Sequence, residues 1–239
     1  MKKQLLLFAF FFCAGLAQAQ QSWSLGLDYF PNLSETRSIG VVDISEKESP
    51  KFCNNIGFSL SRELSPGWML VTGIGFANIG HRYTDNSLRW GSQHNGNGGF
   101  DPTLPAGEDI EGITINYNYD YLEAPLKVQY SPLTGPWRLY LSGGVLFRVF
   151  LGQRYIIIKN LGGLGESVVQ EKNATDINPL ALALHSGIGL ERTLAGRYQL
   201  FLEPRLQLSY FGGRSYGNDF QEKYLSYGAA AGLRLKLGR

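Results

Sequence analysis

Apolar and polar residues alternate along most of the chain with a period of two, which is the spacing of side chains on one face of a β-strand. In the stretch 122–130 the two faces are Leu122, Ala124, Leu126, Val128 and Tyr130 against Glu123, Lys127 and Gln129. Just before it, Tyr117, Tyr119 and Tyr121 share the other parity. The apolar face therefore changes near Tyr121, and we expect a β-bulge or a change of environment there.

Seven further segments repeat this alternation. Strands are expected at residues 22–30, 54–64, 68–77, 117–130, 137–149, 180–191, 198–210 and 225–237. The connections between them alternate long and short, as in outer-membrane barrels, which have short periplasmic turns and longer outer loops. The predicted fold class is all-β: an eight-stranded antiparallel transmembrane β-barrel with up-and-down topology.

Four long connections are predicted on the outer side of this barrel. The polar segment from Pro31 to about Cys53 contains two prolines and mixed charges, and His81–Glu111 contains an Asn/Gly tract. The segment Gln153–Lys172 is expected to form a hairpin that projects beyond the bilayer, and a Gly-rich loop precedes Leu225. Each has the composition of an exposed connection.

The facing of the strands distinguishes a membrane barrel from a soluble one. Aromatic residues near strand ends match the interfacial girdles of membrane barrels: Trp23, Tyr29, Trp68, Tyr130, Trp137, Tyr198 and Tyr210. A soluble, lipocalin-like barrel would reverse the faces, with leucines inside and charges outside. Parity alone leaves that alternative open.

The first residues resemble a secretory signal, with Lys2 and Lys3 followed by the apolar run Leu5–Leu16 and the small-residue site Ala17-Gln18-Ala19. We expect a signal peptide at 1–19 and one barrel domain at 20–239. The apolar run is short for a membrane-spanning helix. Phe12, before Cys13, disfavours a lipoprotein signal.

Charge and cysteine content exclude several classes of protein. Removing Lys2 and Lys3 with the leader lowers the 22 basic residues to 20, equal to the 20 acidic ones. A near-neutral chain argues against binding to nucleic acid. Of the two cysteines only Cys53 lies beyond the leader, so neither an internal disulfide nor a cysteine zinc site is expected.

Charged residues fall repeatedly on the face opposite the leucines. The set proposed as an interior charge network is Glu123, Lys127, Arg138, Arg148, Glu203, Arg205 and Arg234, and Asp28 and Glu191 share its parity. The interior of an eight-stranded barrel is just wide enough to be filled by side chains. Opposite charges there should pair, since an unpaired buried charge is costly. We expect these residues to fix the strand register and fill the lumen; a site for a small ligand or ion is the alternative.

No catalytic, cofactor or metal site is expected. His185 and Ser186 suggest a lipid hydrolase, but neighbouring strand residues point to opposite faces and a nucleophile and its base must be within hydrogen-bond reach. Three scattered histidines do not form a metal site. The Gly-Ile-Gly triplets at Gly73 and Gly187 lack the following helix that a nucleotide-binding loop requires.

The hexapeptide Tyr121-Leu122-Glu123-Ala124-Pro125-Leu126 resembles the YLEIPL-like strand of the PorT-type outer-membrane β-barrel family, and Glu203-Pro204-Arg205 supports the resemblance. Ala124 departs from the pattern, which usually has a larger aliphatic residue there. The resemblance implies a small barrel in the outer membrane of a Gram-negative bacterium. It also implies a link to type IX protein secretion, the process with which the founding member is associated.

Together these observations predict a non-enzymatic outer-membrane barrel with a binding or assembly role and no cofactor. The expected partners are outer-membrane lipid, lipopolysaccharide and other envelope or secretion proteins. A lipid-modifying barrel enzyme and a purely structural, membrane-anchoring barrel are the alternatives.

Overall fold

The computed structural model describes residues 23–39, 47–86, 110–133, 135–161, 165–171, 179–211 and 221–237. The predicted leader and most of the predicted loop His81–Glu111 lie outside this set. Ten strands are present in it: β1 Trp23–Ile39, β2 Glu48–Ser65, β3 Trp68–Ile79, β4 His81–Asp85, β5 Ile110–Tyr130, β6 Trp137–Leu161, β7 Gly165–Glu171, β8 Leu180–Leu194, β9 Tyr198–Phe211 and β10 Gln221–Lys236. Among the described residues, no helix is long and apolar enough to cross a membrane.

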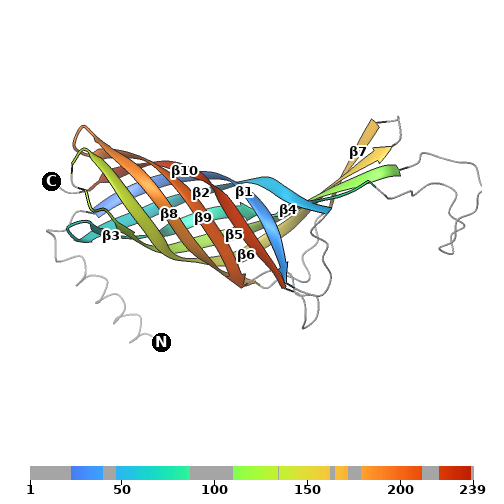
Figure 1. The fold of residues 1–239 in the computed structure, drawn as a ribbon, viewed down its shortest axis with the longest axis horizontal. Coiled ribbons are helices and arrows are strands. Elements are labelled where there is room, and N and C mark those ends of the chain that lie inside the picture. Colours follow the sequence, from blue (N-terminus) through green and yellow to red (C-terminus); the bar gives the residue numbers. More distant parts are fainter. Residues whose placement is uncertain are drawn as a thin grey trace, which may run out of the picture.

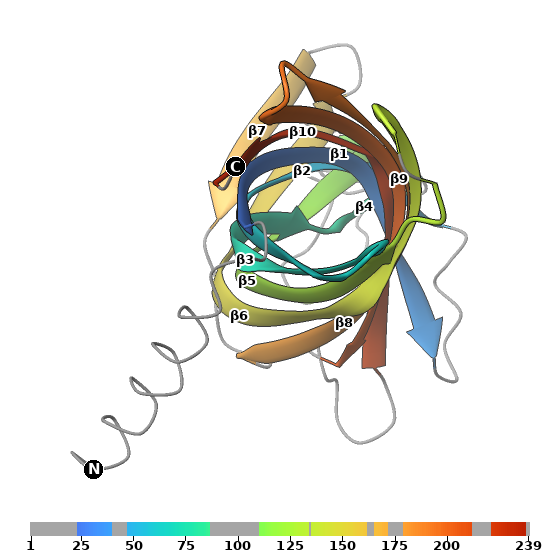
Figure 2. The same ribbon diagram turned by 90° about the vertical axis from the view of Figure 1, so that its left-hand side faces the viewer.

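Antiparallel pairings close most of these strands into a ring. Starting at β1, the hydrogen-bonded neighbours run β2, β3, β5, β6, β8, β9 and β10, and β10 pairs with β1 again. The view toward the end of the barrel shows the strands arranged as a closed ring (Figure 2). A closed ring leaves no sheet edge within the barrel wall. The all-β antiparallel class is therefore confirmed.

The structure has ten strands where the sequence predicted eight, because two strands form in predicted connections. β4 follows β3 after Gly80 and pairs with β2 and β5. β7 pairs with the last residues of β6, from Tyr155↔Glu171 to Leu161↔Gly165, which is the hairpin expected in Gln153–Lys172. With the ends of β5 and β6 these strands continue past the ring as a sheet at one end of the barrel, opposite the C-terminus (Figure 1).

The first predicted loop is also shorter than expected. Strand β1 continues through Pro31 to Ile39 and β2 begins at Glu48, so the prediction of a loop from Pro31 to Cys53 is wrong over much of its length. The two strands remain in register beyond Pro31, with Asn32 opposite Cys53 and Ser34 opposite Lys51. Backbone pairing between neighbouring strands thus prevails over the low β-propensity of this polar segment.

The other end of the barrel carries tight connections. β2 and β3 are joined through Gly67, which has a φ of 81°, and β8 and β9 through Ala195 and Gly196, with φ values of 48° and 74°. A positive φ is readily adopted by glycine and uncommon for alanine. β1 begins and β10 ends at this same end, where Ser24 lies opposite Lys236. We call it the short-turn end.

The two faces of the wall differ in chemistry as predicted for a membrane barrel. Large apolar side chains point outward and are exposed, among them Leu25, Phe58, Leu141, Ile188 and Leu202. The charged and amide side chains are buried inside. The arrangement is opposite to that of a soluble barrel, so the lipocalin-like alternative is wrong.

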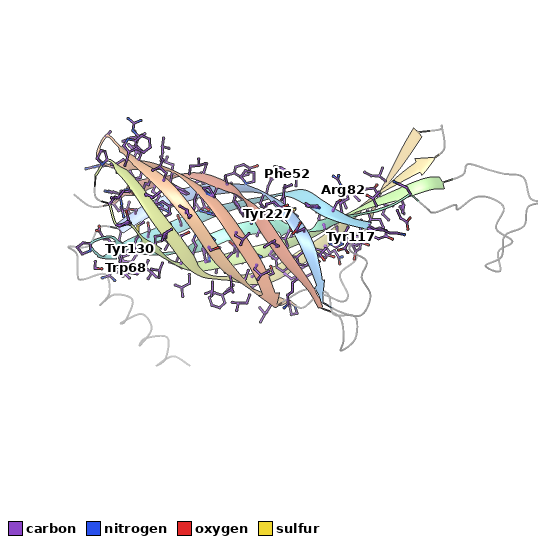
Figure 3. The ribbon with its side chains drawn as sticks, viewed as in Figure 1. Phe52, Trp68, Arg82, Tyr117, Tyr130 and Tyr227 are labelled. Carbon is purple, nitrogen blue, oxygen red and sulfur yellow. The ribbon has the colours of Figure 1, made fainter. Side chains whose placement is uncertain are left out.

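The outward apolar belt has a measurable height along the strands. On β2 it runs from Phe52 to the level of Arg62, and a membrane β-strand needs about 9–11 residues to cross a bilayer. Figure 3 shows Trp68 and Tyr130 at the short-turn end, with Phe52 and Tyr227 farther along the wall. The outward face of β5 becomes polar beyond Leu122, where Asp120 accepts a hydrogen bond of 2.6 Å from Asn78. The apolar belt on β5 therefore ends near Glu123.

The change of pattern at Tyr121 coincides with the strand irregularity and the change of environment that the sequence predicts there. The parity of β5 is unbroken, because Tyr119, Tyr121, Glu123 and Lys127 all point inward. The irregularity lies in the neighbouring strand: Asp120 pairs with Gly152 and Tyr121 with Phe150, leaving an extra residue in β6. What changes along β5 is the content of the lumen, from charged to aromatic.

Candidate functional site: the barrel lumen

The lumen is organised in rows of inward side chains that follow the strand register. One row joins Asp28, Gly57, Gly75, Glu123 and Arg148, each opposite the next on neighbouring strands. The two glycines in the middle of the row leave space between the carboxylates. The alternation of the sequence places these side chains inside, and the register sets them at one level.

Arg148 anchors one side of this row. Its Nη2 lies 2.8 Å from the Glu123 carboxylate, and its guanidinium donates hydrogen bonds to Gln207 at 2.7 Å and Ser209 at 3.0 Å. Only 1% of Arg148 is exposed. A planar guanidinium with several donors suits such a divided set of acceptors, so Arg148 ties β5 and β6 to β9 across the lumen.

Glu203 is the centre of a second group. It is fully buried, and its carboxylate accepts hydrogen bonds from Tyr140 at 2.8 Å, Ser142 at 2.9 Å and Arg205 at 2.9 Å. The Arg205 Nη1 lies 2.9 Å from Asp28. One guanidinium therefore links two carboxylates, and the group connects β6, β9 and β1.

A third group closes the lumen near the short-turn end. Arg234 Nη1 lies 2.7 Å from Glu191, and Gln199 donates to the same carboxylate at 2.8 Å. The Arg234 guanidinium also lies over the Phe201 ring, 4.5 Å from its centroid. Arg138 approaches Glu191 at 3.5 Å, and its side chain is 22% exposed. Arg138 is thus at the rim, whereas the other predicted residues are within the lumen.

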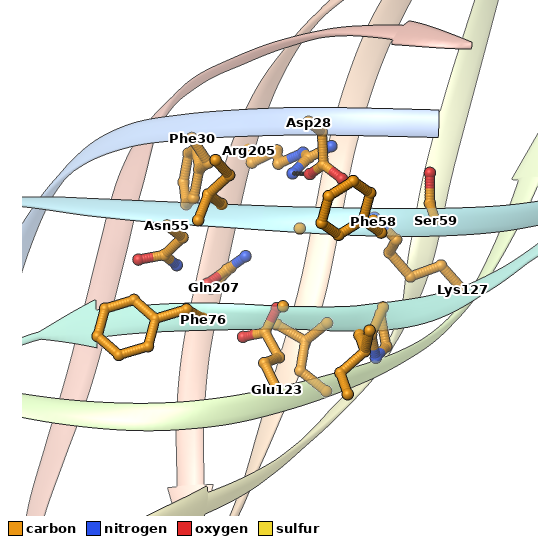
Figure 4. A pocket seen from close by; sticks show the side chains of 16 residues that line it. Asp28, Phe30, Asn55, Phe58, Ser59, Phe76, Glu123, Lys127, Arg205 and Gln207 are labelled. Carbon is orange, nitrogen blue, oxygen red and sulfur yellow. Dashed lines mark hydrogen bonds and ion pairs between the residues drawn. The ribbon is translucent and has the colours of Figure 1, made fainter. Parts of the chain in front are cut away.

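Lys127 is brought close to these groups without a direct partner among the described residues. It is buried and lines a cavity of about 30 Å³ together with Asp28, Asn55, Glu123 and Arg205 (Figure 4). Such a cavity has room for about one or two water molecules. Arg205 already pairs with the carboxylates of Asp28 and Glu203. Lys127 therefore belongs to the network only because its charge lies near theirs.

Farther from the short-turn end than the charged groups, the lumen is filled by apolar and aromatic side chains. Tyr119, Tyr121 and Tyr224 are buried together with Ala77, Ile79 and Ala181. The His81 ring stacks on Tyr117 with 4.4 Å between centroids, and Tyr117 meets Tyr155 edge to face at 5.1 Å. We call this set the aromatic layer. Alternation along the sequence does not predict that Tyr117 and Tyr119 pack in the lumen with Tyr224 of β10.

The suggested pair His185 and Ser186 does not form. His185 is buried inside the barrel, and Ser186 is exposed on the outer face. The Nε2 atom of His185 instead lies 3.0 Å from Ser142 and 3.2 Å from Glu203, while its Nδ1 atom has no hydrogen-bond partner in the structure. A serine–histidine–carboxylate relay needs the serine and the acid on different ring nitrogens, which this geometry lacks.

No metal centre is found in the part of the chain that the structure describes. Among those residues, no three His, Cys, Asp or Glu side chains gather in a group that could hold a metal ion. Cys53 is a buried free thiol. The lumen's chemistry is therefore that of ion pairs, hydrogen bonds and aromatic packing.

A closed antiparallel ring with a leucine-rich exterior and a charged interior defines the chain as an integral β-barrel protein of the outer membrane. A family model described as "Outer membrane protein beta-barrel domain" matches residues 17–238. The chain belongs to this family.

Solved structures of several outer-membrane proteins are similar to the chain. Neisserial surface protein A is 11% identical, with 90% of this chain and 97% of that chain covered and a TM-score of 0.43. OprG from Pseudomonas aeruginosa is 11% identical, with coverage of 91% and 97% and a TM-score of 0.47. The outer-membrane protease OmpT from Escherichia coli is 9% identical, with coverage of 90% and 97% and a TM-score of 0.45. No curated protein matches the chain.

Proposed function

We propose that the protein is a non-enzymatic, non-conducting barrel of eight membrane-spanning strands, which holds the sheet of β4, β5, β6 and β7 outside the membrane for binding or assembly. The observation that carries the proposal is the contrast between a filled lumen and strands that continue past the ring (Figure 1). A barrel closed by side chains serves poorly as a channel. A rigid wall serves well as a base for an exposed binding segment.

The geometry also supports a role without catalysis. The group that most resembles a hydrolytic centre, Ser142 with His185 and Glu203, is buried, and both partners of the histidine share one ring nitrogen. Buried carboxylates that are already held by arginines are poor general bases. The alternative of a lipid-modifying enzyme predicts that His185→Ala or Ser186→Ala changes lipopolysaccharide acylation; our proposal predicts no change in either variant.

For the partner we propose a component or cargo of type IX secretion, on the strength of the Tyr121–Leu126 resemblance. Deleting the protein should lower the delivery of type IX cargo to the cell surface, as followed by surface proteolysis and blotting. Unchanged delivery would contradict the secretion role while leaving a different binding role intact.

A shortened hairpin separates binding from membrane anchoring. Tyr155 and Glu171 lie directly opposite each other, so residues 156–170 can be replaced by an Asn-Gly turn, the usual choice for a two-residue hairpin loop. We expect the variant to keep its heat-modifiable gel mobility and to lose function as the deletion does. Full function in this variant would favour a purely structural barrel.

Conductance in planar bilayers tests the closed lumen. The wild-type protein should show no steady single-channel current, because charged groups and the aromatic layer fill its interior. A stable open level in the unmodified protein would contradict the proposal.

A further inference from the structure

The outer rim of the short-turn end repeats one arrangement around the barrel. Trp23, Trp68, Trp137 and Tyr198 are the first residues of β1, β3, β6 and β9, which are alternate strands of the ring. Their cross-strand partners differ: Trp23 lies opposite Arg62 and Trp137 opposite Arg192, whereas Trp68 lies opposite Tyr130. The two Trp–Arg pairs are on opposite sides of the ring, separated by β3 and β5.

In both pairs the arginine covers the indole ring. The Arg192 guanidinium carbon is 4.9 Å from the Trp137 ring centroid, and that of Arg62 is 5.3 Å from Trp23. Trp137 is 51% exposed and lies in line with the outward residues Leu139 and Leu141. The Arg192 guanidinium, which lies over the Trp137 ring, has an N–H edge that matches two oxygens of a phosphate group.

Position and charge identify the occupant. The rim lies where the apolar belt ends, at the level that lipid headgroups occupy, and aromatic residues favour that level. Exposed Arg197 adds positive charge to the turn after Arg192, and its carbonyl accepts a hydrogen bond from the Lys236 backbone. Glu63 is the exposed acidic residue among the described residues of this rim.

We propose that the Trp137–Arg192 pair binds the phosphodiester group of an anionic glycerophospholipid in the adjoining leaflet. The guanidinium donates to the phosphate oxygens, the indole packs against the glycerol and upper acyl chain, and Arg197 favours a lipid with net negative charge. One basic residue near an anionic surface contributes about 1 kcal/mol, which is about fivefold in relative affinity.

Trp68 provides a control within the same protein, because it lies at the same rim against Tyr130 at 4.7 Å between centroids and not against an arginine. Full-length mature protein that retains only Trp137, or only Trp68, with the other tryptophans changed to Phe, is reconstituted in phosphatidylcholine bilayers. One set of bilayers contains brominated phosphatidylglycerol, and a second set contains the same fraction of brominated phosphatidylethanolamine. Tryptophan quenching reports which lipid is enriched at each position.

We expect the Trp137-only protein to prefer phosphatidylglycerol about fivefold, and the Trp68-only protein to show no preference. Arg192→Gln in the Trp137-only protein should abolish the preference, and Arg192→Lys should retain part of it because the charge remains. Heat-modifiable mobility verifies that each variant is folded. The proposal is overturned if Trp137 shows no preference, if Trp68 shows an equal one, or if Arg192→Gln leaves it unchanged.

Discussion

The part of the lumen nearer the short-turn end and the part farther from it are closed by different interactions. From the level of Glu123 to the short-turn end, ion pairs and hydrogen bonds connect strands across the interior; Arg148 on β6, for example, donates a hydrogen bond to Gln207 on β9. Farther from that end, the lumen is closed by van der Waals contacts of the aromatic layer; the rings of Tyr121 and Phe150, for example, lie 5.6 Å apart between centroids. Directional bonds between specific atoms depend on one strand register, whereas ring packing tolerates small shifts.

This difference explains how the barrel combines a fixed wall with strands that extend beyond it. The charged groups are at the level of the apolar belt, where register must be maintained. The aromatic layer is where β3 passes through Gly80 into β4 and where β6 accommodates its extra residue. We infer that the charged part determines the register and the aromatic part seals the lumen.

Loss of Glu203 should produce the largest effect. Glu203→Leu leaves Tyr140 without its acceptor, removes one of the two partners of Ser142 and removes one carboxylate from Arg205, so we expect about 3–5 kcal/mol lower free energy of unfolding. Denaturant titration of the refolded protein in phospholipid bilayers measures it. Glu203→Gln retains the shape and some acceptors and should cost less; an equal loss in both variants would contradict a specific role for the charge.

An aromatic truncation should cost less and act differently. Tyr121→Ala removes ring contacts in the aromatic layer and should lower the free energy of unfolding by about 3 kcal/mol, while Tyr121→Phe keeps the ring and should cost less. Because the charged groups still fill the lumen beneath, Tyr121→Ala should remain non-conducting in planar bilayers. Conductance in this variant alone would mean that the aromatic layer is the real barrier.

Much of this barrel could be predicted from the sequence, since alternation reveals strands and inward parity. The alternation correctly predicts that the side chains of five charged residues point into the lumen: Glu123, Arg148, Glu203, Arg205 and Arg234. It did not show which partners meet, because contacts across the lumen depend on the stagger of the closed ring. The role of Tyr224 was hidden for the same reason. The composition of residues 31–39 predicts a loop, whereas their pairing with β2 and β10 makes them a strand.

Lys127 tests whether every interior charge contributes to stability. It lines the small cavity, and the carboxylates that line the same cavity, Asp28 and Glu123, are already held by Arg205 and Arg148. Replacing a poorly paired buried charge by an apolar side chain is often neutral or stabilising, so Lys127→Met should change the free energy of unfolding by less than about 1 kcal/mol, or raise it. Arg148→Met is the matched comparison, and it should be clearly destabilising because Glu123 loses its partner.

The smallest change in the free energy of unfolding is expected for a charged residue outside the lumen. Arg82 in β4 is exposed and donates a 3.0 Å hydrogen bond to Asn116 on β5 (Figure 3). Exposed polar pairs contribute little, so Arg82→Ala should change the free energy of unfolding by less than about 0.5 kcal/mol. A loss as large as that of Glu203→Leu would mean that the sheet beyond the ring, and not the charged lumen, stabilises the barrel. A small loss combined with weakened partner binding would instead assign Arg82 to the exposed binding surface, because the same substitution would then separate recognition from folding.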